Sequence, residues 1–87
     1  MLLVWLVVDN ASIANNLNMN KYFLLQLATK LKTIRKEKGL TQDDLAINGV
    51  SRSMISLLEL ARTDVTVSKL KIIADNLGVE IKDLFDF

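Results

Sequence analysis

A turn signal with a capped helix start on each side is the feature that most constrains this chain. Asn48 and Gly49 form the turn signal, and Thr41 and Ser51 stand where the flanking helices would begin. Each of these hydroxyl side chains can accept a hydrogen bond from a free backbone amide of the first helical turn. The pattern predicts two short helices joined by a tight turn, the second held across the first with its N-terminus exposed.

The residues around this pair also repeat with a helical period. Apolar residues recur at spacings of three and four between residues 24 and 34, and Gly39 follows as the expected left-handed end of that helix. A further helix is expected from the cap Thr66 to Gly78, and a short last helix over residues 79–85. The residues expected in the core are Leu24, Leu27, Ala28, Leu31, Ile34, Leu45, Ala46, Val50, Ile55, Leu58, Leu70, Ile73, Ala74 and Leu77. The sequence therefore predicts an all-α domain of five helices over residues 21–87.

The first 20 residues differ from this domain. Residues 1–8 read MLLVWLVV, a run that is too short to span a bilayer and lacks the basic start of a secretory signal. Such a run of Leu, Val and Trp favours a β-strand, which we expect to pair with the same strand of a second copy. Disorder, or packing as a helix on the same core, are the alternatives. Residues 9–20, rich in Asn, Ser and Ala, are expected to be a linker.

The composition argues against catalysis and against metal binding. The 87 residues include neither cysteine nor histidine, which removes disulfides, thiolate metal sites and the commonest general base. The adjacent carboxylates Asp43 and Asp44 fit the first turn of a helix better than acid–base chemistry. We therefore expect no enzyme activity, no cofactor and no metal, and a cytoplasmic location consistent with the lack of cysteine. A core of this size is marginal alone, which favours a homodimer.

The charge of the chain is unevenly distributed although its net value is only +1. Residues 30–38 carry five cations and one anion, whereas residues 75–87 carry four anions and one cation. One end of the molecule can therefore face phosphate groups while the other faces away from them. The alternative is that both clusters are ordinary solvated helix faces.

Several ordered motifs resemble the Cro/CI-type (XRE-like) helix-turn-helix repressors. They are LKTIRKEKGLTQDDLA, GVSRSMIS, Glu59 and VTVSKLKIIADNLGVEIKDLF, and they extend over most of residues 21–85. Within this family the chain is most similar to restriction–modification controller proteins and short phage-type regulators. The resemblance implies a transcriptional regulator that binds a palindromic operator in double-stranded DNA as a homodimer. The alternative is an antitoxin-type interaction module that binds both operator DNA and a cognate toxin; a membrane anchor is not expected.

The resemblance also implies roles for individual residues. Arg52 can donate two hydrogen bonds to guanine, and Gln42 can donate to phosphate from the start of its helix. Arg35 and Glu59 match a charged pair that ties the first helix of the domain to the end of the third. The predicted DNA contacts are Gln42, Ser51, Arg52, Ser53, Ser56, Leu57, Arg62, Thr63 and Lys36. The predicted dimer interface comprises Leu2, Leu3, Val4, Trp5, Leu6 and Val7 in the apolar run, and Leu84, Phe85 and Phe87 at the other end.

Three positions depart from the family pattern. Ala46 and Gly49 enclose two residues where the family usually has three, so the helix before the turn ends early or the turn differs. Leu57 is apolar where the family carries polar side chains; it can touch a thymine methyl group, turn inward or join an interface. Ala61 replaces a common glycine, which predicts that the third helix runs on further than usual.

Overall fold

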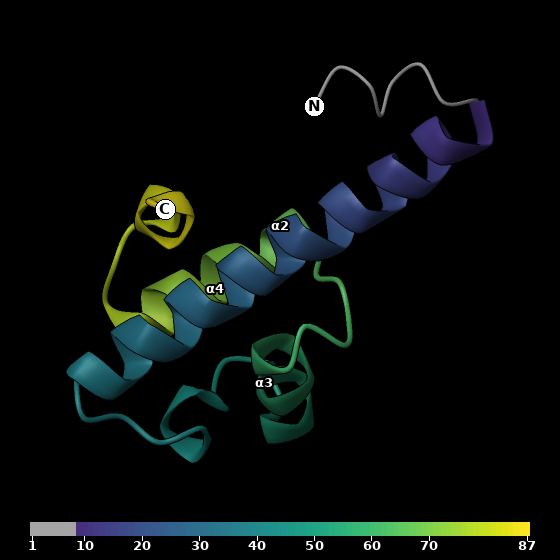
Figure 1. Cartoon of the computed structure of the whole chain (residues 1–87). Coiled ribbons are helices and arrows are strands. Elements are labelled where there is room, and N and C mark those ends of the chain that lie inside the picture. The colour runs from purple at the N-terminus through teal and green to yellow at the C-terminus, as the bar shows by residue number, and fades with distance from the viewer. Residues whose placement is uncertain (1–8) are drawn as a thin grey trace.

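The computed structural model describes the backbone of residues 9–87 and the side chains from residue 20 onward. This part of the chain forms three α-helices and two short 3-10 helices, and no strand. They are α2 (Asp9–Glu37), η1 (Asp43–Leu45), α3 (Arg52–Glu59), α4 (Val67–Leu77) and η2 (Ile81–Phe85). The long helix α2 packs against α3 and η2, while α4 packs against η1 and η2 (Figure 1). The all-helical class predicted from the sequence is confirmed.

The helix count and the first helix differ from the prediction. Two of the five expected helices are 3-10 turns, so five α-helices are not confirmed in the described residues. Residues 9–20, expected to be a linker, are helical: the long helix extends through them, and neither proline nor glycine interrupts the chain between residues 9 and 37. The strand predicted for residues 1–8, with its interface residues, lies outside the described part of the chain. Within the described residues, no helix combines the length and the apolar character needed to cross a membrane.

The helix ends form where the sequence places their signals. The side chain of Ser51 accepts a hydrogen bond from the Met54 amide at 3.1 Å, which caps α3. Thr66 caps α4 in the same way, accepting from the Lys69 amide at 3.2 Å. Gly39, with φ of +71°, follows the end of α2 in the left-handed conformation that an added side chain would disfavour. These local signals fix the start of α3, the helix on which the candidate site is built.

The end of α3 closes on an alanine. Ala61 has φ of +55°, and its amide donates to the Leu58 carbonyl while the Arg62 amide donates to the Leu57 carbonyl. This pair of bonds is the arrangement that usually closes on glycine. The predicted extension of the helix is wrong, since α3 ends at Glu59 and the alanine itself adopts the left-handed conformation. The strain in such a residue is roughly 1–2 kcal/mol.

One hydrophobic core joins all five elements. Its buried members are Leu27, Leu31, Ile34, Leu45, Val50, Ile55, Leu58, Leu70, Ile73, Ala74, Leu77 and Leu84. The predicted core residues are buried apart from Leu24 and Ala46, which are half-buried. Leu84 is 0% exposed, so its assignment to a dimer interface is corrected: it fills the core of its own chain and has no surface to offer a partner. This shared core holds α3 against the other helices.

Candidate nucleic-acid interface

Helix α3 has one buried side and one outward side. Ile55 and Leu58 point into the core, one turn apart. The outward side carries Arg52, Ser53, Ser56 and Leu57. The first backbone amides of the helix have no partner within it beyond the cap from Ser51, so this end carries free donors and a partial positive charge.

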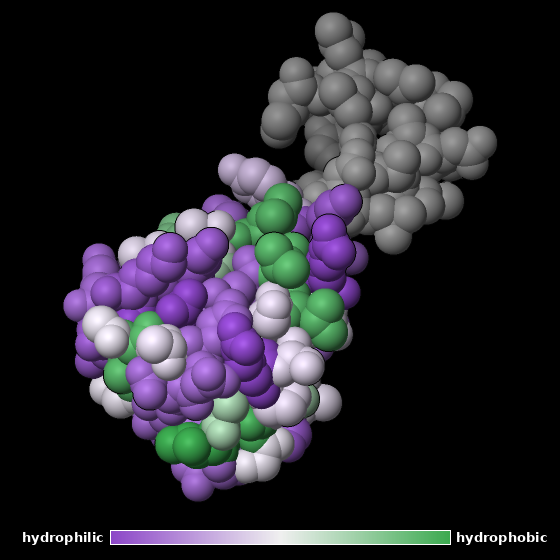
Figure 2. Space-filling view, turned by 90° about the horizontal axis from the view of Figure 1, so that it is seen from below, coloured by the Kyte–Doolittle hydropathy of each residue, from purple (hydrophilic) through white to green (hydrophobic). Residues whose placement is uncertain are grey.

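The outward residues of α3 and Gln42 together line a hollow of about 500 Å³. Its lining combines an amide, two hydroxyls, a guanidinium and one apolar side chain, and every member belongs to the predicted DNA-binding set. The hollow therefore brings five of the nine predicted contacts to one place. Figure 2 looks from below onto the side where η1 and α3 lie in Figure 1, and this face is mainly hydrophilic, with hydrophobic residues in separate patches.

The other four predicted contacts lie on neighbouring segments. Ser51 and Thr63 line a second hollow of about 500 Å³ that adjoins the first along α3. Arg62 is exposed in the loop that follows α3, and Lys36 is exposed in the last turn of α2. Neither of these two cations lines either hollow, so they can reach only groups at the margin of the surface.

Arg52, which lines the first hollow, forms an ion pair with Asp43. Its Nε atom lies 3.5 Å from Oδ1 of Asp43 in η1, and both side chains are more than half exposed. An exposed ion pair of this kind contributes at most about 1 kcal/mol. The guanidinium is therefore available to a stronger, bidentate partner.

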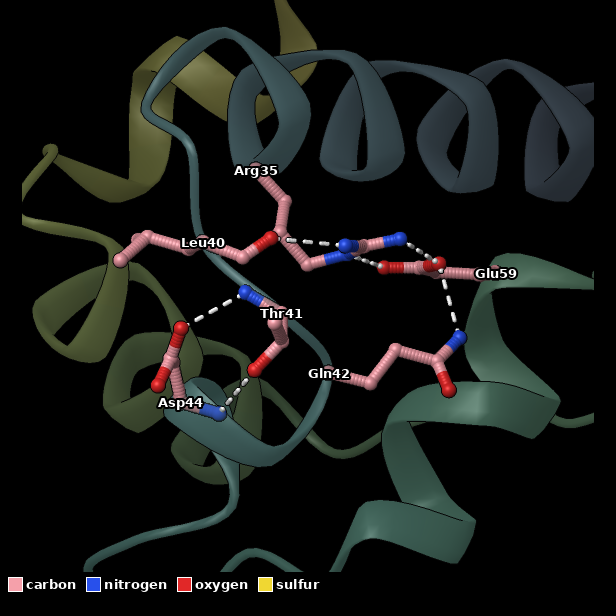
Figure 3. A network of polar contacts seen from close by, with 6 residues as sticks. All are labelled: Arg35, Leu40, Thr41, Gln42, Asp44 and Glu59. Carbon is pink, nitrogen blue, oxygen red and sulfur yellow. Dashed lines mark hydrogen bonds and ion pairs between the residues drawn. The ribbon is translucent and has the colours of Figure 1, made fainter.

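A buried ion pair ties α2 to α3 next to Gln42. The Arg35 guanidinium donates to both carboxylate oxygens of Glu59, from Nε at 2.5 Å and from Nη2 at 2.9 Å (Figure 3). Its Nη1 donates to the Leu40 carbonyl at 2.8 Å. The two charged side chains are only 9% and 3% exposed. The Gln42 amide donates to the same carboxylate at 3.1 Å, so the network links α2, the following loop, η1 and α3.

This network keeps both partners charged. Burial by itself raises the pKa of Glu59, but hydrogen bonds from Arg35 and Gln42, with the charges of Arg35 and Lys32, lower that pKa below its ordinary value. The hydrogen bond to Glu59 raises the pKa of Arg35 against the opposing effect of burial. One hydrogen of the Gln42 amide is committed to Glu59, and the second remains able to donate outward. Lys32, which was not among the predicted contacts, lies near this site and belongs to the basic run of the sequence.

The start of η1 is closed by a reciprocal pair of bonds. The Thr41 amide donates to Oδ2 of Asp44 at 2.7 Å, and the Asp44 amide donates to Oγ1 of Thr41 at 3.1 Å (Figure 3). The bond from the Thr41 backbone holds the pKa of Asp44 below its ordinary value. This capping box orients η1, and with it Gln42, beside α3.

The helix before the shortened turn ends early, since η1 stops at Leu45. Ala46, with φ of −85° and ψ of 60°, has already left the helical conformation. Asn48 and Gly49 are both left-handed, with φ of +59° and +87°. Leu57 nevertheless remains exposed, so the shorter turn does not draw it into the core.

Two side chains of α4 hold this turn. The Asn76 amide donates to the carbonyls of Leu45 at 3.0 Å and Ile47 at 3.1 Å, and its oxygen accepts from Nδ2 of Asn48 at 2.9 Å. Nζ of Lys69 donates to the Gly49 carbonyl at 2.7 Å. Sequence reasoning missed both α4 residues. The only related signal in the sequence was the turn between Ala46 and Gly49, which is one residue shorter than usual in the family.

Both a family model and a solved structure match this chain. A family model described as HTH_3, helix-turn-helix, matches residues 31–84. Among solved structures, the chain is similar to the crystal structure of an HTH_3 family transcriptional regulator from Vibrio cholerae, with 33% sequence identity and a TM-score of 0.70. That match covers 75% of this chain and 37% of the other, so the chain spans little more than a third of that protein. No match was found among curated proteins.

Proposed function

Because this chain belongs to the HTH_3 helix-turn-helix family, we propose that it binds double-stranded DNA sequence-specifically and regulates transcription. The observation that carries the proposal is the hollow along the outward side of α3, whose lining residues suit both base edges and phosphates. The similar protein from Vibrio cholerae is described as a transcriptional regulator, which supports the regulatory part of the proposal.

In this proposal α3 enters the major groove with its first turn against the bases. A helix with its side chains is about 10–12 Å across and the groove is about 12 Å wide, so a single helix fits. Arg52 exchanges its weak contact with Asp43 for two hydrogen bonds to a guanine, worth roughly 1–3 kcal/mol of discrimination. Ser53 and Ser56 adapt to either donor or acceptor groups, and Leu57 meets a thymine methyl group.

Phosphate contacts position the domain on the duplex. The hydroxyl of Ser51 is a donor at the N-terminus of α3, where the helix dipole favours an anion, and the free hydrogen of the Gln42 amide is a second donor beside the hollow. Lys36 and Arg62 add positive charge at the margins of the surface. Each phosphate neutralised by such a group releases counterions, so the affinity falls steeply with salt.

We also propose that the protein acts as a homodimer. One α3 reads one half-site, and a two-fold axis places two such helices about 34–36 Å apart on one face of DNA. The supporting feature is an aromatic cluster of Phe23, Phe85 and Phe87, with ring centroids 5.8–6.4 Å apart. Phe85 is 39% and Phe87 is 50% exposed, so a second copy can bury this surface.

Fluorescence anisotropy of a labelled duplex across a salt series tests the proposal. We expect the logarithm of the binding constant to fall linearly with the logarithm of the salt concentration. Each phosphate contact should contribute about −0.9 to the slope. Lys36→Gln should reduce that slope by about one unit, whereas the matched change Lys82→Gln in η2, at the acidic end of the chain, should leave it unchanged. Absence of binding at low salt to selected and random duplexes alike would refute the proposed function.

A further inference from the structure

We propose that Asn76 and Lys69 of α4 are positioning residues, which hold the turn between η1 and α3 and so set the position of α3 on DNA. The inference rests on the proposed DNA binding. It adds to that function two residues of α4, which does not line the hollow beside Arg52, although Lys69 lines the second hollow with Ser51 and Thr63. Their contacts are with the backbone of the turn rather than with the outward side of α3.

The polar groups of the two side chains match the needs of the turn. The Asn76 amide uses both of its hydrogens on the carbonyls of Leu45 and Ile47 and its oxygen on Asn48. The ammonium group of Lys69 takes the next alternate carbonyl, that of Gly49. Alternate carbonyls through the whole turn are therefore bound from one neighbouring helix.

The turn needs these partners because its own helix is too short to supply them. η1 ends at Leu45 after a single 3-10 turn, and the chain then leaves the helical conformation at Ala46. Of the three carbonyls that α4 binds, that of Ile47 also accepts the Val50 amide at 3.2 Å, whereas those of Leu45 and Gly49 accept no amide of the turn. Side-chain bonds from α4 thus supply the partners that the carbonyls of Leu45 and Gly49 lack within the turn.

The geometry of α4 makes it a fixed reference for the turn. Residues 69 and 76 are seven positions apart, which puts them on one side of the helix two turns from each other. Between and beside them Ile73 and Leu77 are buried in the core. Because these core contacts hold α4 in place, the side chains of Asn76 and Lys69 restrain the turn and do not move with it.

The two ends of α3 then have separate anchors. The C-terminal end carries Glu59, which is bound to Arg35 of α2. The N-terminal end, which carries Arg52, follows the turn held by Asn76 and Lys69. Release of the turn therefore moves the base-reading end of α3 while the other end stays in place.

The test compares how well variants distinguish two duplexes, one selected by the unchanged protein from a random pool and one with its sequence shuffled. Lys69→Met and Lys69→Gln remove the same charge at similar length, but only Gln keeps a donor for the Gly49 carbonyl. We expect Asn76→Ala and Lys69→Met to lose about tenfold of the affinity ratio, the size of one misread base pair. Lys69→Gln should keep most of the ratio, and Lys71→Met, an exposed change on the same helix, should keep all of it.

Melting curves confirm that each variant is folded at the temperature of the binding measurement, so a loss of stability is not mistaken for a loss of selectivity. Folded Asn76→Ala and Lys69→Met proteins with an unchanged affinity ratio would overturn the inference. If the unchanged protein does not distinguish the duplexes, the proposed function fails. Residual dipolar couplings of α3 relative to α4 in the free protein then decide this inference separately. A reorientation of α3 in Asn76→Ala but not in Lys71→Met supports it, and an unchanged orientation overturns it.

Discussion

Replacing one partner of the Arg35–Glu59 pair measures how strongly the buried network stabilises the link between α2 and α3. Glu59→Leu removes both carboxylate oxygens, so the Arg35 guanidinium keeps only its bond to the Leu40 carbonyl. Gln42 loses its partner as well. A cation that is 9% exposed is then left without a counter-charge.

The expected cost follows from these losses. Breaking a buried pair from one side costs about 3–5 kcal/mol, and two lost bonds to a charged group, at about 1.5–3 kcal/mol each, give the same range. Because Arg35 retains one carbonyl, we expect about 3 kcal/mol, which lowers the Tm of a domain of this size by about 12–24 °C. The double replacement Arg35→Met with Glu59→Leu removes both charges and should be close to neutral, because apolar side chains often replace a buried ion pair without loss of stability.

Urea unfolding of the unchanged protein, the two single variants and the double variant gives the coupling energy of the pair. We expect a coupling energy of about 2 kcal/mol or more. The exposed pair Lys71–Asp75, whose charged atoms approach to 2.6 Å, is the control and should show less than about 1 kcal/mol. A coupling for Arg35–Glu59 no larger than that of the control would refute the reasoning, because burial would then add nothing to the interaction.

The remaining predictions concern acid stability, the end of α3 and base reading. Because the folded-state pKa of Glu59 lies below its unfolded value, its stabilisation is present above about pH 4.3 and is lost as the pH falls through the folded-state pKa. Urea midpoints between about pH 5 and about pH 3 should therefore fall more steeply in the unchanged protein than in Glu59→Gln; equal slopes would contradict this. Ala61→Gly should raise the stability by about 1 kcal/mol in thermal melts, because glycine relieves the left-handed strain, and a lower Tm would contradict it. In competition assays Arg52→Ala should flatten the preference among duplexes that differ by one base pair, whereas Lys36→Ala should weaken all of them alike; equal losses in both would make Arg52 a phosphate contact.

Local signals predicted the helix ends because the groups that form a cap are neighbours in the sequence. The hydroxyl of Ser51 reaches an amide three residues ahead, and the glycine after α2 adopts the conformation that its missing side chain allows. Residues 9–20 were misread because their polar composition is shared by linkers and by solvated helices. The helix formed because nothing in the segment stops it.

Contacts between segments that are distant in the sequence were harder to predict. The pairing of Arg35 with Glu59, 24 residues apart, came from the family resemblance and not from any spacing within the chain. The bonds from Asn76 and Lys69 leave no pattern at all, because backbone carbonyls are present at every residue and their partners depend on the tertiary fold. Leu84 was assigned to a dimer interface from the family resemblance, and the five residues of η2 are too few for their period to show that this side chain is buried.

Selection of bound duplexes from a random pool tests most directly the central claim, that the outward side of α3 reads base sequence. We expect enrichment of a two-fold symmetric sequence with half-site centres about one helical turn of DNA apart, or a multiple of that distance. Recovery of the starting pool without enrichment, at low salt and with folded protein, would contradict the claim.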